Sequence, residues 1–255
     1  MSRSQPSSSL PRVALAAVAV AFALAPAASP ADQAKGPATA GSSLTRIKLP
    51  DLGTPATANR VAAASRGVAG AGAPDAEPLK LTLLVPEQTA FAASADPMLY
   101  WHASAAADQP VMLTLNDVSN GELLLEVELG ERVRAGINDV DLGEFGIRLQ
   151  PGREYDWWIA VVSDPTAHSS DLAAGAVVRR IEPDAALAAK LAGADGATRV
   201  HRLAEAGLWY DALAAASELI EARPDEPAYR ELRAALLDGA ELPELAAADR
   251  AGAMR

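Results

Sequence analysis

The sequence predicts an α+β protein in which a block of β-strands is followed by a block of helices. Between Leu79 and Glu182, short apolar runs alternate with turn residues, a pattern typical of antiparallel sheets. From Pro183 onward, apolar residues recur at the spacing of helices. The residues ahead of Leu79 follow neither pattern.

The N-terminal residues 1–31 read as a secretory signal peptide. Arg3 and Arg12 precede an apolar run, Val13–Ala25. This run has 13 residues, fewer than the roughly 20 that span a bilayer. Small residues suited to cleavage follow. We expect an exported protein, periplasmic or secreted, with no membrane span after cleavage; the alternative is an uncleaved N-terminal anchor. Residues 32–78 are rich in Ala, Gly, Pro, Ser and Thr without an apolar period, which predicts a disordered linker.

Residues 79–182 are expected to form a two-sheet β-sandwich. Asn120-Gly121 is a strong signal for a hairpin between the third and fourth strands. The predicted strands are Leu79–Val85, Met98–Ala103, Val111–Asn116, Leu123–Leu129, Ile137–Leu142, Glu154–Val162 and Leu172–Ile181.

The sandwich is organised around the sixth predicted strand, which follows the turn Pro151-Gly152. Tyr155 and Trp157 fall on one face of that strand and Trp158 on the other. An aromatic residue at this point resembles the tyrosine corner of immunoglobulin-like and fibronectin-type sandwiches, where the hydroxyl bonds to backbone upstream. We therefore expect that fold, with Trp101, Tyr155 and Trp157 in its core and His102 on the solvent side.

Residues 183–245 are expected to form a small helical tail, and 246–255 a disordered C-terminus. The spacing of Gly207, Ala212 and Pro224 is similar to that of a tetratricopeptide repeat, although a stable array usually needs about three copies. The tail is therefore expected to dock on the sandwich. The predicted helices are Ala185–Leu191, Thr198–Ala206, Trp209–Ala222 and Pro227–Leu237.

Three aromatic residues are candidates for an interaction or interdomain site: Trp158, Trp209 and Tyr210. If Trp157 faces the core, Trp158 faces outward, where a large apolar side chain marks a contact surface unless something covers it. The pattern favours coverage by the helical tail, with Trp209 on the other side of the contact. The alternative is an exposed Trp158 at the centre of a partner site.

Composition excludes several classes of function. A net charge of −11 argues against nucleic-acid binding, and the absence of cysteine removes disulfides, thiolate metal sites and cysteine nucleophiles. The run from Asp164 to Asp171 brings His168 close to Ser and Asp, but adjacent loop residues do not converge as a catalytic triad must. The acidic run from Glu122 to Glu131 suits a solvated strand face better than a calcium loop. We expect no catalytic, cofactor-binding or metal-binding residues.

Five segments together resemble the bacterial family catalogued as domain of unknown function 928. They are Leu81-Thr-Leu-Leu-Val-Pro86, Asp96-Pro-Met-Leu-Tyr-Trp101, Leu149 to Trp158, Ser163-Asp164 and Gly207-Leu-Trp-Tyr-Asp-Ala-Leu213. The resemblance implies an exported β domain with a short helical tail and assigns no reaction. The function favoured by the sequence is a non-enzymatic binding or scaffolding module for an unidentified protein or peptide. The alternative is a hydrolase or carbohydrate-active accessory domain that uses the loops at one end of the sandwich. The pattern leaves the oligomeric state open.

Overall fold

The structure is a computed structural model that describes residues 47, 49–50, 59–63, 78–163 and 171–252. All of these belong to one compact unit, which spans Ser42–Arg255. The expected signal peptide, most of the expected linker and the loop containing His168 lie outside the described residues.

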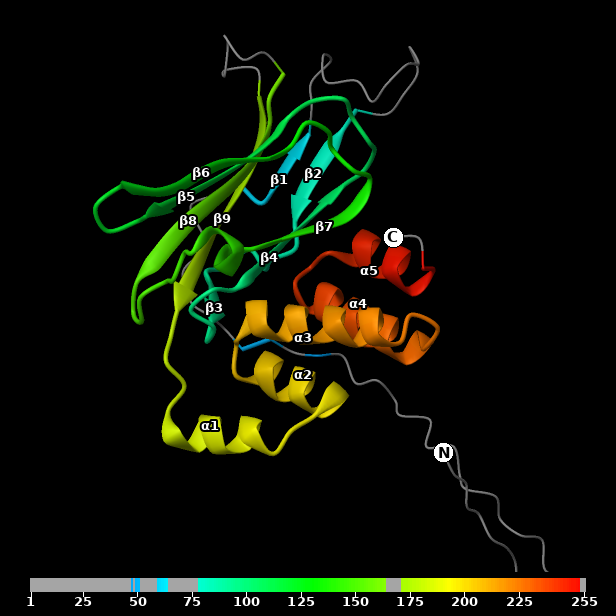
Figure 1. The fold of residues 1–255 in the computed structure, drawn as a ribbon. Helices are drawn as coiled ribbons and strands as arrows, with labels where there is room; N and C mark the ends of the chain where they lie inside the picture. Colours follow the sequence, from blue (N-terminus) through cyan, green and yellow to red (C-terminus); the bar gives the residue numbers. More distant parts are fainter. Residues whose placement is uncertain (1–46, 48, 51–58, 64–77, 164–170, 253–255) are drawn as a thin grey trace, which may run out of the picture. The chain divides into compact units, whose positions relative to one another are not determined.

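The described residues form two mostly antiparallel sheets and five α-helices, so the protein has the predicted α+β fold (Figure 1). The first sheet has the order β1-β2-β4-β7, and its strands are β1 (Val61–Ala63), β2 (Lys80–Leu83), β4 (Met98–Ala103) and β7 (Gly136–Asp141). The second sheet has the order β3-β9-β8-β5-β6, and its strands are β3 (Ala90–Ala92), β9 (Leu172–Arg180), β8 (Glu154–Val161), β5 (Val111–Asp117) and β6 (Glu122–Gly130). Among the strands of the described residues, only β3 and β9 pair in parallel.

All seven strands expected from the sequence are present. The hairpin signal at Asn120-Gly121 joins β5 to β6, and Gly121 has a φ of 69°, in the left-handed region that a glycine adopts without strain. β3 was not expected, because three residues of Ala-Phe-Ala sequence are too few to show an alternating pattern.

The first strand corrects the linker prediction. Val61–Ala63 lies in the segment expected to be disordered, yet it pairs antiparallel with β2. Just ahead of it, Asn59 O accepts a hydrogen bond from Gly175 N at 2.9 Å, and Arg60 O accepts one from Leu83 N at 2.8 Å. Because these bonds use backbone atoms, an Ala-rich sequence without an apolar pattern can still close the two sheets along one edge.

The core lies between the two sheets, where side chains alternate inward and outward along each strand. The inward residues of the central strands are almost completely buried: Leu81, Leu83, Leu99, Trp101, Leu113, Leu115, Trp157 and Ile159.

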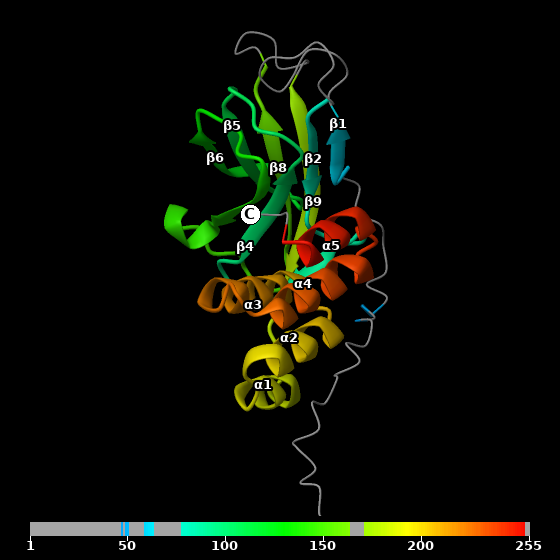
Figure 2. The ribbon, with the colours of Figure 1, turned by 90° about the vertical axis from the view of Figure 1, so that its right-hand side faces the viewer.

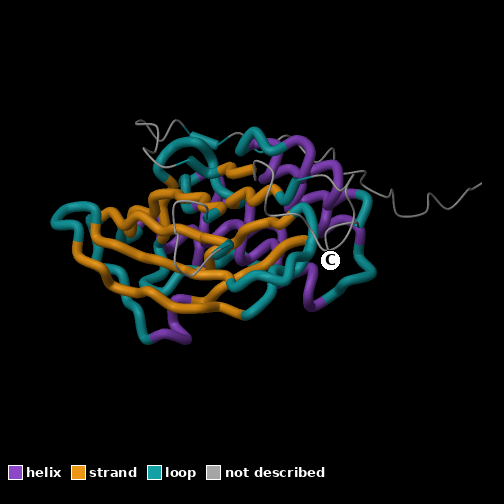
Figure 3. Tube along the Cα trace, turned by 90° about the horizontal axis from the view of Figure 1, so that it is seen from above, coloured by secondary structure: helices purple, strands orange, loops and turns teal. Residues whose placement is uncertain are grey.

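The helices pack against both sheets, through one helix that contacts β4 of the first sheet and β3 of the second. Tyr100, which points outward from β4, hydrogen-bonds to Ser217 in a helix, and burial raises its pKa to about 12. The helical elements are α1 (Ala185–Ala192), α2 (Gly196–Glu205), α3 (Trp209–Ala222), α4 (Pro227–Gly239), α5 (Pro243–Arg250) and the short 3-10 helix η1 (Leu142–Phe145). Figures 1 and 2 show the α-helices beside β4 and away from β5 and β6. From above, most helical turns lie on the side opposite the tip of the β5–β6 hairpin (Figure 3).

The expected disorder of residues 246–255 is wrong as far as Gly252, where the described chain ends. Asp249 in α5 is fully buried and accepts two hydrogen bonds of 2.8 Å from Arg233 in α4. Ala246 is buried against the same helices. The contact was not expected from the sequence because Arg233, which pairs with Asp249, lies 16 residues away along the chain.

Candidate functional site: the outer face of the five-stranded sheet

Trp158 lies at the centre of the outer face of the second sheet. Its strand, β8, directs Trp157 into the core and Trp158 to the opposite side. Across the sheet, Trp158 is in register with Thr114 of β5 and with Gly175 of β9. Thr114 is in turn opposite Glu126 of β6. This row of four residues runs from the edge strand to the middle of β9.

The ring of Trp158 lies directly over Gly175. A Cβ atom at Gly175 would be 2.6 Å from ring carbons of Trp158, so the close approach of ring and backbone requires glycine at that position. The indole Nε1 donates a hydrogen bond of 2.7 Å to Asp156 Oδ2. Trp158 is therefore half-buried by its own sheet. The contact of its ring with Gly175 and the hydrogen bond of its Nε1 to Asp156 fix its orientation.

A shallow groove of about 420 Å³ runs along this outer face. Its floor is apolar, with Met112, Thr114 and Ala160 on neighbouring strands. Glu126 and Glu128 form the side of the groove at β6, and Asp171 lies at its end. With Asp156 beside Trp158, the surface combines an aromatic ring, an apolar floor and carboxylates, and so suits a partner that offers both cations and apolar side chains.

The helical tail does not cover Trp158. Trp209, at the start of α3, is fully buried, and its Nε1 donates to Leu84 O at 2.8 Å. Tyr210 enters the core from the same side, where its hydroxyl accepts a hydrogen bond of 2.9 Å from Trp157 Nε1. The sequence-based expectation that Trp209 and Trp158 meet is therefore wrong, because the tail packs against the first sheet and reaches the inward aromatic of β8.

A third residue of α3 completes the docking of the tail. The carboxylate of Asp211 accepts hydrogen bonds from Ala93 N at 2.7 Å and from Ser94 N at 3.0 Å. Burial raises the pKa of Asp211, and these backbone donors act in the opposite direction. Burial likewise raises the pKa of the Tyr210 hydroxyl. Three consecutive residues of one helix thus hold the backbone and core of both sheets.

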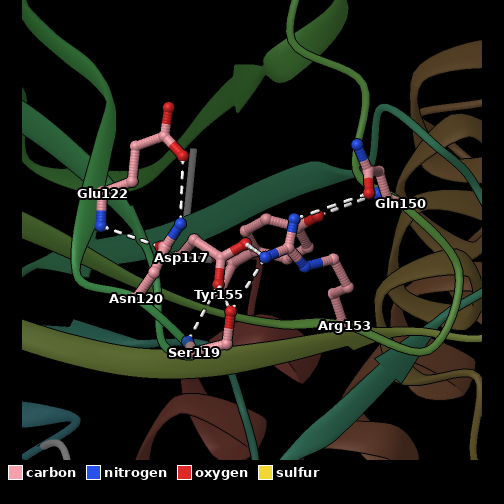
Figure 4. Close-up of polar contacts among 7 residues, drawn as sticks. All are labelled: Asp117, Ser119, Asn120, Glu122, Gln150, Arg153 and Tyr155. Atoms are coloured by element: carbon pink, nitrogen blue, oxygen red, sulfur yellow. Dashed lines mark hydrogen bonds and ion pairs between the residues drawn. The ribbon is translucent and has the colours of Figure 1, made fainter.

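Tyr155 lies where the strand pattern predicts, with its side chain buried and its hydroxyl accepting a hydrogen bond of 2.9 Å from Gln150 N (Figure 4). Next to it, buried Asp117 accepts a hydrogen bond from Ser119 N at 2.8 Å and pairs with Arg153 at 2.9 Å. The Ser119 hydrogen bonds and the Arg153 guanidinium lower the pKa of Asp117. These contacts fix the base of the β5–β6 hairpin, and so the position of β6.

Two other hollows contain titratable groups. One of about 320 Å³, between the first sheet and α5, is lined by His102, Lys80 and Arg60. His102 lies on the outer face of its sheet, as expected, but is half-buried there; burial and the neighbouring Lys80 lower its pKa. The other, of about 300 Å³, lies where α2 and α3 meet Asp96. Lys80 pairs with Glu244, Arg60 pairs with Glu87, and Asp211 accepts hydrogen bonds from backbone N–H groups. These groups therefore stabilise contacts within the fold.

Two negative observations concern the described residues alone. No group of three or more His, Asp or Glu side chains in this part of the chain is placed to hold a metal ion. Nor does any helix there have the length and apolar character to cross a membrane.

Sequence reasoning singled out Trp158 but missed most of the residues around it. Ala160 shares its strand and, by the two-residue period, its face, whereas Met112 and Thr114 lie beside this strand only because of the register. The one local signal was Gly175, a glycine inside a predicted strand, which indicates a close approach by another group.

Comparison with known proteins identifies the chain's family without adding an activity. A family model described as Domain of Unknown Function (DUF928) matches residues 61–250. Its start coincides with β1 and its end with the last residue of α5. A search of curated proteins found no match. Because the matched segment covers most of the chain, the protein belongs to the family described as Domain of Unknown Function 928.

Proposed function

We propose that this protein is an exported, non-catalytic binding or scaffolding module that holds a protein or peptide partner on the outer face of its five-stranded sheet. In this proposal the two sheets form an immunoglobulin-like sandwich. The helices act as a tetratricopeptide-like support that docks on the opposite side. The signal-like residues 1–31 support export.

The observation that carries the proposal is the half-buried Trp158 on the same sheet face as a groove that no described α-helix covers, next to the groove residue Thr114. A Trp ring held by a glycine beneath it and a carboxylate beside it has little freedom to lose on binding. Aromatic residues of this kind are enriched at the energetic centres of protein interfaces. Trp209 and Tyr210, the other two candidate residues, are buried within the fold, so neither is accessible to a partner.

A charge placed on the floor of the groove tests the proposal. Met112→Arg would fill the groove and disrupt its apolar floor, whereas Ala189→Arg adds the same charge to an exposed position of α1. Each variant, with its unfolding midpoint checked against the wild type, would be used to capture partners under native conditions. The proposal predicts that Met112→Arg loses a partner that the wild type and Ala189→Arg both retain. Equal recovery by both folded variants would show that the partner binds elsewhere.

A further inference from the structure

The edge of the second sheet next to the groove is an unpaired strand. β6 is nine residues long and the last strand of its sheet, and it pairs only with β5. Among the described residues, the backbone of β6 makes no backbone–backbone hydrogen bond to a strand other than β5, although Glu122 N, at its start, donates to Asn120 Oδ1. Long edge strands are normally protected, because free N–H and C=O groups pair with other chains.

β6 carries some of the features that protect an edge, namely three Glu side chains and two register irregularities, but it lacks others. It has no Lys and no Pro, and its sequence is Glu-Leu-Leu-Leu-Glu-Val-Glu-Leu-Gly. Register shifts near Leu124 and Leu129 interrupt the pairing towards its two ends. Between them the segment Leu125–Glu128 pairs regularly with β5. At the hairpin end, Leu123 is 53% exposed and Val118 49% exposed, the two large apolar side chains that stand out as exposed in the described chain.

The side chains of the regular segment divide between the two faces. Leu125 and Val127 lie opposite the buried Leu115 and Leu113, so they belong to the core face. Glu126 and Glu128 lie on the outer face and line the groove. A strand added beside β6 would therefore meet carboxylates on one face and apolar groups on the other.

The charge of β6 decides between possible occupants of this edge. In a symmetric antiparallel pair with a second copy centred on Val127, Glu126 of each copy would lie opposite Glu128 of the other. Like charges directly opposite are destabilising across strands, and opposite charges are favourable. No Arg or Lys occurs in β6 to relieve the repulsion. The net charge of −11 adds a long-range attraction for cationic partners.

We propose that β6 binds a basic, extended peptide segment as an additional antiparallel strand, with Lys or Arg side chains at every second position and apolar side chains between them. The basic side chains pair with Glu126 and Glu128 over the groove, and the apolar ones cover Leu125 and Val127. Main-chain bonds to β6 supply affinity and the alternation supplies specificity. This inference rests on the proposed function, since it specifies the chemical class of the partner at the same surface.

The test uses two synthetic ten-residue peptides of equal composition and the full chain. One peptide alternates Arg with Val; the other has five Arg followed by five Val. At an ionic strength of about 0.15 M, where distant surface charges are screened, the alternating peptide is expected to bind at least tenfold more tightly than the block peptide. Hydrogen exchange is expected to slow at the amides of Glu122–Gly130 when the alternating peptide is bound.

Matched charge reversals provide the control. Glu126→Lys with Glu128→Lys is expected to weaken binding of the alternating peptide roughly tenfold or more, because two attractive cross-strand pairs become repulsive. Glu205→Lys with Glu218→Lys, at exposed positions of α2 and α3, changes the net charge equally and is expected to alter binding less than twofold. Equal weakening by both double variants, or equal binding of both peptides, would reduce the effect to non-specific attraction and overturn the inference.

The remaining outcomes separate this inference from the proposed function. Self-association of the wild type that protects the β6 amides and excludes the peptide would identify a second copy as the occupant and overturn the inference. Failure of the peptides to bind, while Met112→Arg still abolishes capture of a native partner, would also overturn it but leave the proposed function intact. Retention of the native partner by folded Met112→Arg would instead contradict the proposed function.

Discussion

The hydroxyl of Tyr155 links a turn recognisable in the sequence to a bond found in the structure. Pro151-Gly152 sets the turn, and Gly152 adopts a φ of 79°. The chain then returns so that Tyr155 reaches Gln150 N, five residues upstream. Local geometry of this kind is predictable from sequence because all of its parts lie within a few residues of one another.

Tyr155→Phe is expected to destabilise the protein by about 1 kcal/mol or slightly more, because Gln150 N loses its acceptor in a partly buried site. Urea unfolding would measure the change as a lower midpoint with an unchanged slope. An unchanged midpoint would mean that the hydrogen bond contributes nothing to stability and would contradict the corner interpretation.

Gly175→Ala is expected to cost about 1–3 kcal/mol, because the added methyl group overlaps the Trp158 ring and forces it out of its position. Gly130→Ala, in the same sheet, is the matched control, since the nearest atom to its new Cβ would be 3.9 Å away. The difference in unfolding free energy between the two variants measures the contact. Equal costs would show that Trp158 is not held against β9.

At the scale of elements, α3 contributes most to joining the helices to the sheets. Trp209, Tyr210 and Asp211 bond respectively to Leu84, to Trp157 and to the backbone after β3. A helix that begins with three such residues is positioned by its first turn. α2 and α4 pack against it, and α1 and α5 pack in turn on α2 and α4.

Trp209→Ala is expected to destabilise the whole protein by roughly 3 kcal/mol or more, the range for truncating a buried Trp. The variant also leaves Leu84 O without its donor in a buried position. Far-ultraviolet and near-ultraviolet circular dichroism would follow helices and tertiary packing through the same denaturant titration. Loss of helical signal at lower denaturant than the sheet core would contradict a single cooperative unit.

The helices and strands were predicted from the sequence more reliably than the contacts between residues of different elements. The boundaries of α3 and β4 agree with the expected ranges, because apolar periodicity determines local structure. The contacts of Trp158 with Gly175, of Asp249 with Arg233, and of Asn59 with Gly175 were missed. Each joins residues that only the folded chain brings together, and nothing in either local sequence specifies the other.

At the scale of the whole molecule, the helices contact the sheets through α3, at β3 and β4, and leave the groove on the outer face of the second sheet uncovered. The two sheets and the helices share one continuous set of buried residues. The second sheet presents Trp158 and the unpaired edge of β6 on the side that the helices leave open. We propose that the helices stabilise the fold and that this side binds the partner.

The isolated fragment from Pro183 to Arg255 is expected to be largely unfolded. Without the sheets, Trp209 and Tyr210 lose their partners, and an Ala-rich helical segment of this size buries too little apolar surface to be stable alone. Circular dichroism of the fragment during heating provides the measurement. A cooperative helical melt would show that the tail is an independent module.

Photo-crosslinking in the native host tests the central claim most directly, because it captures whatever molecule lies against the chosen residue. A photoreactive amino acid would replace Thr114 on the groove floor or, as a control, the exposed Ala247 of α5. The account predicts a specific crosslinked adduct from position 114 that position 247 does not give, and its loss in the Glu126→Lys, Glu128→Lys background. An adduct from position 247 with none from position 114 would place the binding surface on the helices and contradict the account.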